Sequence, residues 1–152
     1  RAADDVSRTL GDEFNSREGT VFIIVKISDL STRGSLISLD KDANNRFTLE
    51  LYNNGEARAF YRNSGSFKAV STPQLLSGVH RIAATYSVND NRISLVHSGI
   101  VYDLSDSTIV DVGVDTLFVG SYSADNRSIV HVLESTYYPY AMTDTELEEL
   151  TK

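Results

Sequence analysis

The feature that most constrains the fold of this chain is a regular series of short β-forming runs separated by turn residues. Asn, Asp and Gly tolerate the positive φ of tight hairpin turns, and they stand between consecutive runs, as in Asn53-Asn54-Gly55 and Asn63-Ser64-Gly65. About ten strands at this spacing indicate an antiparallel sandwich or barrel, because a parallel sheet needs long crossovers. The runs that predict strands are residues 20–28, 35–39, 46–52, 56–62, 66–71, 79–87, 92–97, 100–104, 116–121 and 128–137.

Alternation within three of these runs predicts which side chains are buried. Apolar residues alternate with polar ones in residues 46–52, 79–87 and 92–97, so we expect these runs to share one sheet with a buried face and a polar outer face. Residues 21–25 are apolar on both faces and should be covered on both. The predicted core residues are Phe47, Leu49, Leu51, Ile82, Ala84, Tyr86, Ile93 and Leu95, and the predicted exposed residues are Arg46, Glu50, Arg81, Thr85 and Ser94.

One helix is predicted at the C-terminus, over residues 143–151. Thr143 and Glu146 have the spacing of a capping box, and Met142 and Leu147 stand where a hydrophobic staple belongs. Leu147 then forms one narrow apolar stripe with Leu150, so we expect the helix to lie across the sandwich. Glu148 and Glu149 should point outward.

The length of 152 residues fits a single domain, residues 1–152, with a sizeable core. Residues 1–15 are predicted to be a lead-in strand or loop. The chain begins with Arg1 and not with Met, which we interpret as a fragment or a processed product.

Composition argues against several classes of function. The net charge is −7 and no two basic residues are adjacent, so we expect no nucleic-acid binding, which depends on clusters of Lys and Arg. The longest apolar run, residues 21–25, is far shorter than the roughly 20 residues that cross a bilayer, so we expect no membrane insertion. The chain has no cysteine, which rules out a disulfide framework and a thiolate metal site.

The sequence carries no signature of catalysis, and we predict that the protein is not an enzyme. A retaining glycosidase needs two carboxylates about 5–5.5 Å apart, whereas Glu50, Glu56 and Glu134 each stand alone in a predicted strand. Neither a G-x-S-x-G elbow nor a phosphate-binding glycine loop is present. The three histidines stand in separate predicted strands and are interpreted as structural or surface imidazoles; they are His80, His97 and His131.

No cofactor is predicted, and Ca²⁺ is the one metal left as an alternative. Asp40, Asp42 and Asn44 begin like a calcium loop, but the sixth and twelfth positions of an EF-hand are Asn45 and Leu51 here. We therefore interpret the segment as a solvated hairpin turn and predict no metal site. If the chain binds Ca²⁺, Asp40, Asp42 and Asn44 are the predicted ligands.

Tyrosine is the residue type that best fits binding chemistry in this chain. There are 8 Tyr and no Trp. A Tyr ring can stack on a sugar while the Tyr hydroxyl remains solvated. The alternative is that Tyr is frequent because it suits β-strands. The tyrosines near predicted turns are Tyr52, Tyr61, Tyr102 and Tyr122.

Several segments resemble one protein family. They are Arg1-Ala2-Ala3-Asp4 with residues 16–22, then Asn45-Arg46-Phe47, residues 78–90, residues 117–121, and residues 137–151, which are similar to the family's closing YYP…LTDAELQALT. In this order the chain resembles, over essentially its whole length, the concanavalin A-like, laminin-G-type domains of bacteriophage tail, fibre and spike proteins. The resemblance implies a jelly-roll β-sandwich. The motifs belong to the scaffold, so no binding residue is carried over from the family.

The resemblance also implies a function, a location and partners. It implies a non-catalytic binding module of a phage virion appendage, on the particle surface or tail, that recognises host-surface carbohydrate. The alternative is a structural, assembly or decoration domain of a virion protein without a glycan ligand. The implied partners are a host-cell glycan, other virion proteins and further copies of this chain in a homotrimer.

Loops carry recognition in a hairpin-built sandwich, so we place the candidate ligand there. Tyr122 would stack on a sugar ring, while Asp125, Asn126 and Arg127 would hydrogen-bond its hydroxyls. The alternative is that Asp125 and Asn126 only form a turn and that Arg127 is only a solvated charge. The remaining candidate residues are Asn44 and Arg46 in a second loop, and Arg81 and Thr85 on an exposed sheet face.

Overall fold

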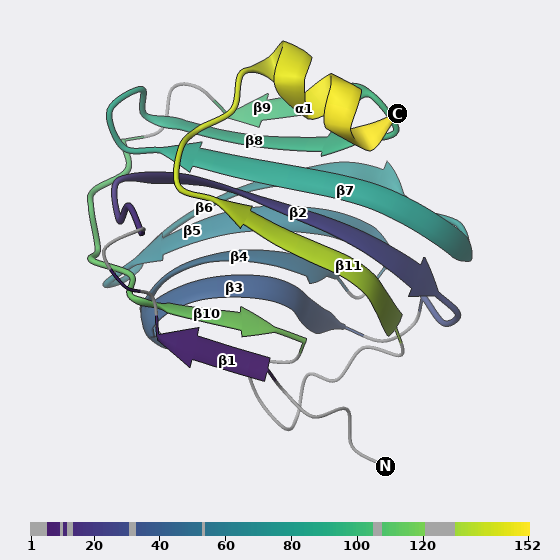
Figure 1. Cartoon of the computed structure of the whole chain (residues 1–152), viewed down its shortest axis with the longest axis horizontal. Coiled ribbons are helices and arrows are strands. Elements are labelled where there is room, and N and C mark those ends of the chain that lie inside the picture. The colour runs from purple at the N-terminus through teal and green to yellow at the C-terminus, as the bar shows by residue number, and fades with distance from the viewer. Residues whose placement is uncertain are drawn as a thin grey trace.

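The computed structural model describes residues 6–9, 11, 14–30, 33–52, 54–104, 108–120 and 130–152, and these form two antiparallel sheets and one helix (Figure 1). The six-stranded sheet has the order β1 (Val6–Thr9), β10 (Thr116–Val119), β3 (Gly34–Asp42), β4 (Asn45–Leu51), β5 (Glu56–Asn63) and β6 (Ser66–Gln74). The five-stranded sheet has the order β11 (Val130–Tyr138), β2 (Glu18–Ile27), β7 (Gly78–Ser87), β8 (Arg92–His97) and β9 (Ile100–Leu104). The helix α1 spans Asp144–Thr151.

The all-β sandwich predicted from the turn spacing is confirmed, and every predicted strand segment overlaps an observed strand. The turn chemistry explains the agreement, because Ser64, Asn91 and Ser98 adopt positive φ in the hairpin turns. β1 forms where the sequence left a choice between a lead-in strand and a loop. It extends the edge of the six-stranded sheet by pairing with β10.

The core lies between the two sheets and contains all eight predicted core residues, each fully buried. Rings from opposite sheets meet in it, with the centroid of Phe47 4.7 Å from that of Tyr86. One part of the prediction is wrong: β4 belongs to the six-stranded sheet, whereas β7 and β8 belong to the five-stranded sheet. Alternation identifies the inward face of a strand but carries no information about which sheet the strand joins.

Three residues predicted to be exposed are buried: Glu50 is 3% exposed, Thr85 1% and Ser94 0%. The alternation was correct, since all three point away from the core, but the outer faces are themselves covered. For Thr85 and Ser94 the cover is the C-terminal segment with α1, which lies across β7, β8 and β9 (Figure 1). Of the other two residues predicted to be exposed, Arg46 is half-buried and Arg81 is exposed.

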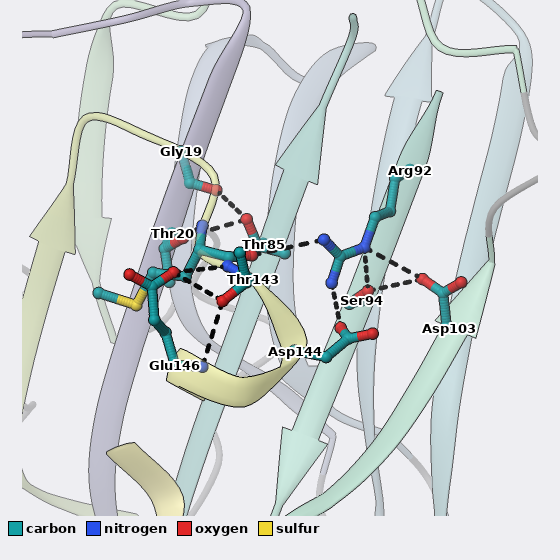
Figure 2. Close-up of polar contacts among 10 residues, drawn as sticks. Gly19, Thr20, Thr85, Arg92, Ser94, Asp103, Thr143, Asp144 and Glu146 are labelled. Carbon is teal, nitrogen blue, oxygen red and sulfur yellow. Dashed lines mark hydrogen bonds and ion pairs between the residues drawn. The ribbon is translucent and has the colours of Figure 1, made fainter. Parts of the chain in front are cut away.

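Polar contacts fasten this C-terminal segment to the sheet (Figure 2). Thr20 Oγ1 donates to Tyr140 O at 2.9 Å and accepts from Met142 N at 3.0 Å, while Thr85 Oγ1 donates to Gly19 O within the sheet at 2.9 Å. Arg92 contacts Asp144 on the helix and, through Nε, lies 2.8 Å from Ser94 Oγ. The buried hydroxyls are therefore satisfied by hydrogen bonds, which removes most of the cost of burying them.

The predicted helix start is confirmed. The Thr143 side chain accepts from Glu146 N, and the Glu146 side chain accepts from Thr143 N, which completes the capping box. Met142 and Leu147 are buried in a second apolar cluster with Phe22, Ala83 and Val96, so β2 is covered on both faces as predicted. Glu149 is exposed, whereas Glu148 is half-buried. No helix in the described part of the chain is long and apolar enough to cross a membrane.

Candidate functional site

Four arginines lie on the outer face of the six-stranded sheet, which we call the arginine face. They are Arg33, Arg46, Arg58 and Arg62. The same face carries the rings of Tyr52, Phe60 and Phe67 and the carboxyl groups of Asp40 and Glu50. Alternation places these residues there, because the intervening residues of β4 and β5 fill the core. Four of the chain's 14 basic residues thus share one sheet face of a protein with net charge −7. No helix or further layer of the described residues covers this face (Figure 1).

Glu50 organises one side of the arginine face. Its Oε1 accepts from Arg58 Nε at 2.6 Å and also contacts Arg58 Nη2, while its Oε2 accepts from Arg33 Nε at 3.3 Å. The carboxylate is buried with both oxygens engaged, as a buried charge must be. This pairing explains why the prediction that Glu50 is exposed is wrong, and it holds two guanidinium groups in fixed orientations.

Aromatic rings lie beside the guanidinium groups of the arginine face. The Arg58 guanidinium carbon lies 3.7 Å from the Tyr52 ring centroid and 5.3 Å from that of Phe67. Arg46 lies over Phe60 at 5.4 Å, and Arg62 lies over Phe67 at 5.8 Å. Such cation–π contacts attract a guanidinium to the face of a ring and leave its N–H groups able to donate to a ligand.

Arg46 and Arg62 are directly opposite each other on β4 and β5. Like charges at opposed positions of an antiparallel pair repel, so an anion between them would be favoured. Arg62 Nη1 donates weakly, at 3.5 Å, to Ala43 O in the β3–β4 turn. Among the described residues no carboxylate forms an ion pair with Arg62.

Asp40 is opposite Arg46 on β3 and is only 2% exposed. Burial raises the pKa of Asp40 to about 6, and the Ser38 hydrogen bond and the Arg46 charge only partly offset this rise. Ser38 Oγ donates to Asp40 Oδ1, whereas Asp40 Oδ2 has no hydrogen-bond partner among the described residues. Arg46 therefore stands beside a carboxyl that holds its proton unusually strongly.

The residues predicted to bind calcium point in different directions. Asp42 Oδ1 accepts from Asn44 N at 2.8 Å and from Asn45 Nδ2 at 3.0 Å, which closes the turn after β3. These hydrogen bonds lower the pKa of Asp42, and the one from Asn45 has a larger effect than the one from Asn44. Asp40 instead faces Ser38 in the sheet. The described residues contain no group of three or more His, Cys, Asp or Glu able to hold a metal ion.

The inventory of strand carboxylates drawn from the sequence was incomplete, because β3 extends to Asp42 and so includes Asp40. Asp40 and Glu50 share the arginine face, which brings two carboxyl groups to one side of the sheet. Neither is presented to a substrate: both are at most 3% exposed, and Glu50 is neutralised by two arginines. A general acid or nucleophile must reach the scissile bond, so this pair lacks the accessibility that catalysis requires.

The predicted ligand residues are scattered by the fold. Tyr122, Asp125, Asn126 and Arg127 lie outside the described residues. Asn44 is exposed in the β3–β4 turn at the margin of the arginine face, and Arg46 lies within that face.

The other predicted site, on the five-stranded sheet, is closed by the chain itself. Arg81 Nη1 donates to Lys152 O at 2.8 Å, and Thr85 lies beneath the C-terminal segment. Thr85 is 1% exposed, so its side chain is not accessible to a ligand in this arrangement of the chain.

The tyrosines that the sequence placed near turns also lie in different environments. Tyr61 is buried, its hydroxyl donates to Val110 O at 2.9 Å, and burial raises its pKa to about 12. Tyr102 is half-buried against the core. Tyr52 supports Arg58 on the arginine face.

Sequence reasoning missed Arg33, Arg58, Arg62, Phe60 and Phe67. A signal was present, because Arg58, Phe60 and Arg62 occupy alternate positions of one strand and must share its outer face. Arg33 precedes β3, and no local pattern connects it with Glu50.

Solved structures with the same fold were found across nearly the whole chain. The IT-sialidase CBM40 of Ruminococcus gnavus bound to α2,3-sialyllactose matches with a TM-score of 0.72 at 19% identity, over 90% of this chain and 83% of that one. The NanB sialidase of Streptococcus pneumoniae matches with a TM-score of 0.78 at 18% identity, over 97% of this chain but 27% of that one. A pentraxin of Limulus polyphemus matches with a TM-score of 0.67 at 15% identity, over 95% and 80%.

The domain therefore has a concanavalin A-like, jelly-roll β-sandwich fold. No protein-family profile matches the chain, and no curated protein matches it in sequence.

Proposed function

We propose that this domain is a non-catalytic glycan-binding module and that its arginine face binds an acidic sugar through the sugar's carboxylate. The observation that carries the proposal is the opposed pair Arg46 and Arg62, backed by Phe60 and Phe67, on a sheet face that no described helix covers. Each guanidinium group carries N–H donors of the kind that bind a carboxylate.

The aromatic rings fit the rest of a sugar. Phe67 is 43% exposed and its ring centroid lies 5.2 Å from that of Phe60. An exposed ring beside a guanidinium can pack against the C–H face of a pyranose while the guanidinium binds its charged group. In the Arg33–Glu50–Arg58 cluster one carboxylate already engages both guanidinium groups, so the cluster serves to order the face and to place Tyr52.

The fold neighbours agree with this chemistry. Two of them are the Ruminococcus gnavus CBM40 in complex with α2,3- and α2,6-sialyllactose, the second matching 97% of that domain's length at 16% identity. Sialyllactose carries one carboxylate on its terminal sugar. We therefore place sialylated and other carboxylate-bearing glycans ahead of neutral ones.

Titration calorimetry on the whole chain tests the proposal. The glycans are sialyllactose, a uronic-acid oligosaccharide and their neutral counterparts, and Arg62→Gln should weaken binding of the acidic glycans by about tenfold or more, the scale of one charged hydrogen bond. Arg81→Gln is the matched control, since Arg81 lies on the other sheet and its loss should leave binding unchanged. Equal binding of neutral and acidic glycans, or full binding by Arg62→Gln, would contradict the proposal.

The phage virion appendage, the host-cell glycan and the homotrimer stay predictions from the sequence resemblance. We include them in the proposal as the setting in which such a module would act. Detection of the chain in purified particles by mass spectrometry tests the location, and analytical ultracentrifugation of the chain tests the trimer.

A further inference from the structure

A pair of histidines faces inward at one end of the sandwich, away from the arginine face. His80 on β7 lies beside His97 on β8, with His80 Nδ1 3.0 Å from His97 Nε2. The ring centroids are 5.1 Å apart and the ring planes are inclined by 48°, so the rings meet nitrogen to nitrogen and do not stack. These two histidines stand in separate predicted strands, and the pairing of β7 with β8 brings them together.

The surrounding hydrogen bonds define which nitrogen of His80 is available. His80 Nε2 lies 2.7 Å from Leu76 O, and a carbonyl only accepts, so Nε2 carries a proton. The lone pair of the neutral His80 ring is then on Nδ1, which points at His97.

We propose that His80 and His97 together bind one divalent transition-metal ion that favours imidazole ligands, namely Zn²⁺, Cu²⁺ or Ni²⁺. Metal–imidazole bonds of about 2.0–2.1 Å that meet at roughly 90–110° place the two nitrogens about 2.9–3.4 Å apart. The observed 3.0 Å lies within that range. In the metal-free chain His97 Nε2 donates to His80 Nδ1, so metal binding requires His97 to take its other tautomer, with the proton on Nδ1, and both rings to turn until the two lone pairs meet at the ion.

Two further groups suit a metal site. The donation from His80 Nε2 to Leu76 O is the contact that orients a metal-binding histidine, since it fixes the tautomer and leaves the other nitrogen free. Ser98 Oγ lies 3.2 Å from His97 Nε2 and supplies an oxygen beside the two nitrogens, and water completes the coordination. Ca²⁺ and Mg²⁺ require oxygen ligands and should not bind here.

The site would join the start of β7, which follows the crossover from β6, to the end of β8. Metal binding should therefore raise thermal stability, because an ion that binds only the folded state shifts the equilibrium toward it. This effect does not depend on whether the arginine face binds a glycan.

Calorimetric titration of the whole chain with Zn²⁺, Cu²⁺, Ni²⁺ and Ca²⁺, each alone, tests the proposal. We expect one transition-metal ion per chain, reversal by EDTA and no response to Ca²⁺. His80→Gln and His97→Gln should each weaken binding by about tenfold or more. His131→Gln is the matched control, because His131 is exposed on β11, and it should bind like the parent chain.

A second readout serves if a variant fails to fold. Cu²⁺ added to the unmodified chain should broaden the NMR signals of the His80 and His97 rings before those of His131. Absence of binding by the parent chain, unchanged binding in His80→Gln and His97→Gln, or first broadening at His131 would each overturn the proposal.

Discussion

Replacing Asp40 by Asn should stabilise the domain at neutral pH. Asp40 is 2% exposed, and its Oδ2 has no hydrogen-bond partner in the described part of the chain. Burial raises its pKa from 3.8 to about 6, so the folded state holds the proton more tightly than the unfolded state. Where the folded state binds more protons, stability falls as pH rises.

The size of the effect follows from the pKa. A rise in pKa from 3.8 to about 6 corresponds to about 3 kcal/mol of unfolding free energy at 1.36 kcal/mol per pKa unit. The domain loses this stability as pH increases from about 4 to 6, and the loss is constant above that range. Asn is uncharged at every pH and can still accept from Ser38. Since the two amide N–H groups would take the place of the unpartnered Oδ2, part of this gain is lost, and we expect Asp40→Asn to gain about 1–2 kcal/mol at pH 7.5.

Urea unfolding of both proteins between pH 4 and pH 8 measures this difference. The stability of the parent chain relative to Asp40→Asn should fall by about 3 kcal/mol from pH 4 to pH 6, so the two curves should cross in that range. Asp42→Asn is the control of opposite sign: the pKa of Asp42 is lowered by hydrogen bonds from Asn45 and Asn44, so its stabilisation is present above the unfolded pKa and lost in acid. Parallel curves for the parent and Asp40→Asn, or a less stable Asp40→Asn at pH 7.5, would refute the reasoning.

Three further substitutions test the scaffold by urea unfolding. Thr143→Ala removes the helix cap and should cost about 1 kcal/mol, while a loss below about 0.3 kcal/mol would mean that the capping box does not stabilise α1. Glu50→Ala leaves the 14%-exposed Arg58 side chain without its ion-pair partner and should cost about 3–5 kcal/mol; a neutral result would show that the cluster is not structurally required. Gly19→Ala places a Cβ 2.9 Å from Tyr137 Cε2 and should cost about 1–3 kcal/mol through overpacking, which unchanged stability would contradict.

Local patterns in the sequence were enough to predict the strands, their inward faces and the helix. The core residues of β4, β7 and β8 repeat every second position, and the capping box links Thr143 with Glu146 three positions later. Both patterns depend on neighbours within a few residues, because backbone geometry sets the direction of each side chain. For the same reason the outward direction of Thr85, Ser94 and Glu50 was predicted correctly.

Tertiary structure alone decided which outward faces are covered and which side chains meet. Thr85 and Ser94 are buried because a segment more than forty residues later in the chain folds back over β7 and β8. Glu50 is buried because strand register brings Arg33 and Arg58 to it, and β-pairing brings His80 to His97. A strand's own pattern specifies a face but not the partner strand or the layer above it, so the arginine face and the histidine pair exist only once long-range pairing has formed.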